Sequence, residues 1–340
     1  MMWDLFLSRT YIGVFVAFIA FFAQAETSDE KAAELFKEGY TFYQQYYSPN
    51  AFGKFKQAAQ LGHAEAAYYA GNILRRNHTY ITEEAEKFYR QAAEGGDVYA
   101  MLRLGQDDKF CGTLRNCDYD REKWISKALD TALSRAEAGD SDAMMELFSV
   151  YWAAGDRTSA LEWTVKAAEH GNAFAQYWLA VGLLDEREMG FYWTDAGRRA
   201  DILKWLKASA EQGFPKAMLK LALELRDGGQ LEEARYWVEA MGKTDYYDAI
   251  LESGAAILFG PDAESLYGEG SGYGFAEPRP VEGAAILLAL HRQTGKDAPL
   301  KMIEVYRDKL TPEIMARAEA RSKELLVDTP VIYYLPKFGI

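Results

Sequence analysis

Small and apolar side chains recur along the chain at fixed distances from five glycines: Gly62, Gly96, Gly139, Gly171 and Gly213. Alanine stands four residues after every one of them (Ala66, Ala100, Ala143, Ala175, Ala217) and three residues before it (Ala59, Ala93, Ala136, Ala168, Ala210). Alanine or leucine stands eight residues after it. The pattern predicts units of helix, turn and helix. The glycine ends the first helix, because it adopts a left-handed backbone at little cost.

One such unit could not bury its apolar face alone, so the units must stack. The predicted fold class is therefore all-α: one continuous α-solenoid of helix-turn-helix repeats with extra C-terminal capping helices. Asp140 and Asn172 are expected to cap second helices. A sixth, degenerate unit has Asp245 in the glycine position, which leaves its geometry open. The aromatic residues eight positions before the glycine are expected to pack between units (Phe88, Trp163, Trp205, Trp237).

The best copies of the motif lie at residues 85–105 and 160–180. They resemble the Sel1-like repeat, a relative of the tetratricopeptide repeat, and the resemblance covers residues 45–255. It implies a superhelical scaffold with a concave binding face, and it implies no reaction. Residues 310–325 resemble the helix that often ends such arrays, with Thr311 as its cap and Pro312 at its first position.

The N-terminus is typical of a secretory signal peptide. A short apolar run, residues 11–23, precedes the small-x-small site Ala23-Gln24-Ala25. We expect cleavage after Ala25 and a periplasmic location, with an uncleaved anchor as the alternative. The predicted divisions are therefore a signal peptide (1–25), a Sel1-like solenoid (26–255), a Gly/Pro-rich loop (256–280) and a helical cap with tail (281–340).

Within the cap, three helices are expected at 281–292, 299–310 and 312–326. The apolar tail, residues 330–340, is expected to pack back onto them.

The chain of 340 residues carries a net charge of −13. An acidic surface repels nucleic-acid phosphates and anionic membranes, so neither is an expected partner, and no stable membrane insertion is expected after cleavage. A basic protein partner would be attracted to such a surface.

The search for chemistry finds no catalytic, cofactor-binding or metal-binding set. His-Glu-x-x-His, Gly-x-Ser-x-Gly and phosphate-loop motifs are all missing from the sequence. The chain is therefore not expected to be an enzyme. Its two cysteines, Cys111 and Cys117, are close enough in sequence for a disulfide in an oxidising compartment, with a pair of inert thiols as the alternative.

Segments that interrupt the repeat are the candidate partner-binding regions, because stacking does not explain them. The insertion at residues 106–123 contains both cysteines. Tyr192 and Trp193 lie in a second insertion, residues 185–201, between charged flanks, which suits a binding hot spot and equally a hydrophobic plug under a loop. Tyr267, Tyr273 and Phe275 lie in the Gly/Pro-rich loop, a composition that suits adaptable binding loops, with a packed connector or a disordered segment as the alternatives.

Two hypotheses follow for the function. By analogy with signal-bearing Sel1-like proteins, the chain is a periplasmic immunity protein that neutralises a secreted, phospholipase-like effector of the type VI system. Alternatively, it is an envelope adaptor or regulator that binds a sensor or a polysaccharide-assembly protein.

Overall fold

The computed structural model describes residues 28–76, 78, 81–105, 120–185, 193–263 and 272–337. These residues divide into two compact units, residues 1–131 and 132–340, with the boundary inside one helix. The sequence predicted one continuous array and gave no sign of this division.

The first unit opens with a helix over residues 28–44. It continues with α2 (Ser48–Gln60), α3 (Ala64–Arg76), α4 (Glu83–Glu94), α5 (Val98–Leu104) and the first part of α6 (Arg121–Glu137). The second unit takes the rest of α6 and adds α7 (Ser141–Ala154), α8 (Arg157–Glu169), α9 (Ala173–Leu184), α10 (Asp195–Glu211), α11 (Pro215–Asp227), α12 (Leu231–Met241) and α13 (Tyr247–Phe259).

The five turn glycines have φ between 86° and 98°, so each lies in the left-handed region, as predicted. At each turn the next residue donates its N–H to a carbonyl of the preceding helix, as His63 does to Ala58 at 3.1 Å. The side chains of Asp140 and Asn172 cap α7 and α9, as predicted. The paired alanines around every turn are at most 3% exposed, which lets the two helices approach closely. These features confirm the predicted helix-turn-helix architecture.

Two further glycines, Gly155 and Gly229, make left-handed turns between successive pairs, with φ of 88° and 75°. Among the repeat-position aromatics, Trp237 is buried, whereas Phe88, Trp163 and Trp205 are half-buried. Lys166 and Lys204 lie over the rings of Trp163 and Trp205, with the ammonium groups 4.0 and 4.2 Å from the ring centroids.

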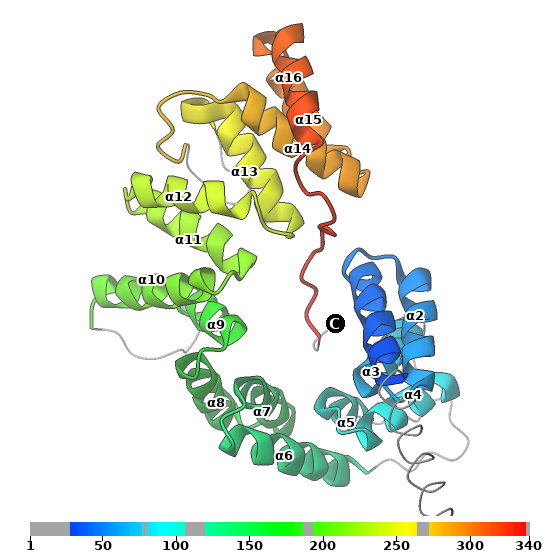
Figure 1. The fold of residues 1–340 in the computed structure, drawn as a ribbon. Helices are drawn as coiled ribbons and strands as arrows, with labels where there is room; N and C mark the ends of the chain where they lie inside the picture. The colour runs from blue at the N-terminus through cyan, green and yellow to red at the C-terminus, as the bar shows by residue number, and fades with distance from the viewer. Residues whose placement is uncertain are drawn as a thin grey trace, which may run out of the picture. The chain divides into compact units, whose positions relative to one another are not determined.

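The capping helices are α14 (Pro280–Thr294), α15 (Ala298–Val305) and α16 (Pro312–Ser322), with short 3-10 turns at Gly260–Asp262 and Arg307–Lys309. The hydroxyl of Thr311 accepts a hydrogen bond from the Ile314 N–H, so the predicted cap of α16 is confirmed. After α16 the chain runs back beside α13 and α11 as an extended segment (Figure 1). Within the described residues, no helix is both long and apolar enough to cross a membrane.

Candidate functional site

Two of the predicted partner-binding residues, Tyr273 and Phe275, lie in the core of the second unit. They are 0% and 6% exposed, so the prediction that they contact a partner is wrong. The Tyr273 hydroxyl donates to the buried carboxylate of Glu252, and the Arg226 guanidinium lies 5.4 Å from the ring centroid. Tyr273 therefore packs into the core between α11 and α13.

Trp193 is 90% exposed just before α10, so it stays a predicted contact. Tyr192, Tyr267, Cys111 and Cys117 lie outside the described residues, and their predicted roles stay predictions.

A continuous row of aromatic rings crosses the second unit from α7 to the start of α11. We call Phe148, Trp152, Phe174, Tyr177, Trp178 and Phe214 the aromatic strip. Phe148 lies 5.6 Å from Trp152 and 6.2 Å from Trp178, measured between ring centroids. The row continues through Phe174 to Phe214 at 6.2 and 6.3 Å, and Tyr177 lies 5.4 Å from Phe214. Each step is a contact distance for aromatic pairs.

The strip is open to solvent over much of its length. Trp152 is 51% exposed and Phe174 is 42% exposed, while the other four rings are half-buried. The guanidinium of Arg157 lies 3.3 Å from the Trp152 ring centroid, which fixes the plane of this ring. Aromatic and arginine side chains in one apolar patch are the composition of protein-binding hot spots.

Two of the strip residues occupy repeat positions whose counterparts in the first unit are buried. Tyr177 and Trp178 stand six and seven residues after Gly171, where Tyr68 and Tyr69 stand relative to Gly62. Tyr68 and Tyr69 are at most 2% exposed. The helix over 28–44 covers Tyr69 through Tyr40 and Tyr43, at centroid distances of 5.7 and 4.9 Å.

At its α11 end the strip meets the C-terminal tail. The ring of Tyr334 lies edge-on to Phe214 and to Tyr246, 5.7 Å from each centroid. Its hydroxyl donates to the Asp245 carboxylate at 2.8 Å, and Lys216 Nζ donates to its backbone carbonyl at 2.9 Å. The tail therefore packs onto the sixth turn and the start of α11, in addition to the predicted contact with the cap.

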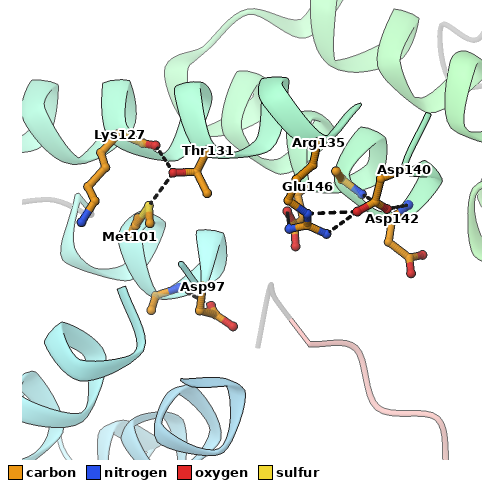
Figure 2. A network of polar contacts seen from close by, with 10 residues as sticks. Asp97, Met101, Lys127, Thr131, Arg135, Asp140, Asp142 and Glu146 are labelled. Carbon is orange, nitrogen blue, oxygen red and sulfur yellow. Dashed lines mark hydrogen bonds and ion pairs between the residues drawn. The ribbon is translucent and has the colours of Figure 1, made fainter. Parts of the chain in front are cut away.

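A polar network fixes the turn at Gly139, which precedes α7. Figure 2 shows the Arg135 guanidinium between the carboxylates of Asp140 and Glu146, with N–O distances of 2.7 and 2.9 Å. The other oxygen of Asp140 accepts from the N–H groups of Asp142 and Ala143. Burial acts to raise the pKa of Asp140, but these N–H groups and Arg135 together hold it below its ordinary value.

Sequence reasoning missed the strip because it searched for interruptions of the repeat. The strip residues stand in regular repeat positions on second helices, where aromatic residues are normally interpreted as packing. The available signal was the double aromatic at 177–178 together with Phe174, which places three large rings within five residues of α9. In the described ranges, no group of three or more His, Cys, Asp or Glu side chains gathers closely enough to hold a metal ion.

Comparison with known proteins finds several chains that are similar to this one over part of their length. A 104-residue segment is 34% identical to an F-box protein of Arabidopsis thaliana, and the match spans 31% of this chain but only 27% of that protein. A protective antigen of uropathogenic Escherichia coli with an SLR fold is similar over 88% of this chain and 69% of its own (19% identity, TM-score 0.36). The immunity protein Pa5087 of Pseudomonas aeruginosa is similar over 58% and 70% (18% identity, TM-score 0.34). No protein-family model matches the chain. At these TM-scores the likenesses carry no argument about function.

Proposed function

We propose that this chain is a scaffold that binds another protein through the aromatic strip of its second unit. The exposed rings of Trp152 and Phe174 within a continuous aromatic row are the observation that carries the proposal. Leaving this apolar surface in water is unfavourable, and burying it against a partner recovers that free energy. The partner we expect is a protein with a basic surface around an apolar centre, because the chain's net charge is −13.

The specific role that we propose is that of a periplasmic immunity protein, which would cover the active-site mouth of a secreted, phospholipase-like effector. Support comes from the resemblance of the chain to signal-bearing Sel1-like proteins and from its acidic charge. The similarity to Pa5087, which is described as an immunity protein, agrees with the idea but adds no weight to it.

Partner capture with matched variants tests the proposal. The chain would be used as bait in periplasmic extract, and captured proteins would be identified by mass spectrometry. The strip variant Trp152→Ala/Trp178→Ala is compared with Tyr236→Ala, which removes an aromatic side chain that is 63% exposed on α12, away from the strip. We expect the strip variant to bind the purified partner with a dissociation constant roughly 30-fold higher or more, since hot-spot residues contribute about 2 kcal/mol.

The control variant should bind like the unchanged chain. Equal binding by the strip variant would remove the strip from the proposal. A captured partner that is a sensor or a polysaccharide-assembly protein would favour the adaptor function. A captured lipase whose activity falls when the chain is added would favour immunity.

A further inference from the structure

The C-terminal tail is held in the second unit in the manner of a bound peptide. Ile332 donates its N–H to the carbonyl of Asp245 at 2.8 Å, and its own carbonyl accepts from the Tyr247 N–H at 3.1 Å. These bonds make a parallel β-bridge between Tyr246 and Ile332. Pairing of backbone groups with an extended segment, plus a pocket for one side chain, is a recurring mode of peptide recognition.

The side chain that fills such a position here is Tyr334. Its ring sits between Phe214 and Tyr246, its hydroxyl reaches Asp245, and its carbonyl is bonded by Lys216. Burial of Lys216 lowers the pKa of its ammonium group, an effect that Asp248 partly opposes. The site therefore offers an aromatic slot, a carboxylate for a hydroxyl and an ammonium group for a backbone carbonyl or a carboxylate.

The tail is seated at a cost in backbone strain. In the described residues four non-glycine residues have positive φ, and three of them, Leu326, Asp328 and Tyr334, lie in this segment. The left-handed region costs such residues roughly 1–2 kcal/mol each. Leu326 and Asp328 precede the seated residues 330–337, so a segment of another chain could make the same contacts without these two bends.

The tail site also continues into the aromatic strip. Tyr177 of the strip lines a cavity of about 130 Å³ together with Lys216, Leu219, Lys220, Leu223 and Tyr246. This cavity adjoins the place where Lys216 and Tyr246 hold Tyr334. A segment that crossed the strip at Tyr177 would therefore reach the tail site through this cavity, which Lys216 and Lys220 line beside Leu219 and Leu223.

We infer that the surface around Tyr334 is a binding site for an extended peptide segment bearing an aromatic side chain, and that residues 330–337 occupy it as an internal ligand until a partner's segment displaces them. The inference rests on the proposed function, since it assigns to that protein partner one extended aromatic segment. A tethered segment is present at an effective concentration on the order of millimolar, so the tail would exclude weak competitors and admit only a segment that binds better.

Peptide binding to chains with a released tail tests the inference without the natural partner. The probe is a fluorescently labelled peptide with the sequence of residues 329–337, followed by anisotropy. The first released chain is the full-length Ile332→Pro/Tyr334→Ala variant, which loses the N–H bonded to Asp245 and the seated ring. The second ends at Asp328. We expect the peptide to bind both at least tenfold more tightly than it binds the unchanged chain.

Two controls define the site. A probe carrying Tyr334→Ala should bind the released chains at least tenfold more weakly. Adding Phe214→Ala to the full-length released chain should have the same effect, because the slot loses one wall. Equal affinity for the unchanged and released chains, or no binding to either released chain, would overturn the inference. Loss of the helical circular dichroism signal in both released chains would also overturn it, since the tail would then be a permanent part of the fold.

The result is separable from the test of the proposed function. Peptide binding to the released chains combined with unchanged partner capture by the strip variant would keep the peptide site and remove the strip. The opposite combination would keep the strip and make the tail purely structural.

Discussion

The first and second units have aromatic side chains at the same repeat positions, but these side chains are buried in the first unit and partly exposed in the second. In the first unit Tyr69 is enclosed by Phe36, Tyr40, Tyr43 and Phe55 and is 2% exposed. In the second unit Trp178 stands at the equivalent position, touches only Phe148 and Phe174 among the ring contacts of the described residues, and is half-buried. The repeat thus fixes where a side chain points, and the neighbouring element decides whether it becomes core or surface.

The difference also shows what kind of element can cover the second-helix face. In the first unit it is an additional helix, residues 28–44, whose Phe36, Tyr40 and Tyr43 project onto α3. Among the described residues of the second unit, the tail covers the α11 end of this face through Tyr334. A face that the chain itself covers in one unit and leaves open in the other is a suitable place for a partner.

The largest expected effect is a difference in stability loss when the equivalent aromatic residue is removed from each unit. Tyr69→Ala removes a buried ring from a closed cluster and should lower the free energy of unfolding of the first unit by about 3–5 kcal/mol. Trp178→Ala removes a half-exposed ring and should cost the second unit only about 1 kcal/mol. Urea unfolding, with pulse proteolysis to identify the unit that opens, measures both. Comparable losses would mean that the strip is structural core.

The next largest effect is expected at alkaline pH, where the first unit should lose more stability than the second. Burial raises the pKa of Tyr43, Tyr69 and Tyr89, although Arg76 acts to lower that of Tyr43 and Arg103 that of Tyr89. Above pH 10, the ordinary tyrosine value, the unfolded unit therefore loses protons that the folded unit keeps. The first unit should then lose stability by about 1.4 kcal/mol per pH unit for each such tyrosine.

Proteolysis at pH 9 to 11 should accordingly cut the first unit before the second. In the second unit burial also raises the pKa of Tyr177 and Tyr247, so a smaller slope is expected there. Tyr89→Phe should flatten the slope of the first unit, and it should cost about 1–3 kcal/mol at neutral pH because the buried Asn72 loses its partner at 2.7 Å. A slope unchanged by this substitution would contradict the assignment.

The turns should respond alike in both units, since their backbone conformation is the same. Gly62 and Gly171 have φ of 98° and 86°, where a side chain is unfavourable. Gly62→Ala and Gly171→Ala should therefore each lower the free energy of unfolding by about 1–2 kcal/mol. Gly53→Ala is the control, because Gly53 lies within α2 where an added Cβ meets no atom within 4 Å. It should stabilise the first unit by about 0.4–1 kcal/mol. Thermal unfolding of the three variants decides whether the shared turn is equally strong in the two units.

The sequence was sufficient for the parts of the molecule that depend on short-range rules. A glycine followed four residues later by alanine indicates a left-handed turn between close helices, and all five turns are where it predicted them. The binding surface depends instead on what covers a given face. Tyr273 and Phe275 were predicted to contact a partner because glycine residues surround them. In the structure Tyr273 is buried, where it contacts Glu252 and Arg226, which are distant in sequence. No prediction was made for Phe174 and Trp178, because they stand in regular repeat positions and do not interrupt the pattern.

The smallest expected effect concerns the Arg135–Asp140–Glu146 network, which lies at the first turn of the second unit (Figure 2). Asp140→Ala removes both the helix cap and the ion pair and should cost about 0.5–2 kcal/mol. Asp140→Asn keeps an oxygen that can accept from Ala143 N–H and loses only an exposed ion pair, so it should cost at most about 1 kcal/mol.

The two variants also differ from the parent chain in acid. Because the pKa of Asp140 is held below its ordinary value of 3.8, its contribution is complete above pH 3.8 and is lost as the pH falls through the folded-state value. Both variants should therefore lose less stability than the parent chain between pH 4 and pH 2, measured as the midpoint of urea unfolding of the second unit. The first unit is the internal reference, because the network lies wholly outside it. If the parent chain and Asp140→Asn lost equal stability in acid, the hydrogen bonds and ion pair of the Asp140 carboxylate would contribute nothing to the acid sensitivity of the second unit.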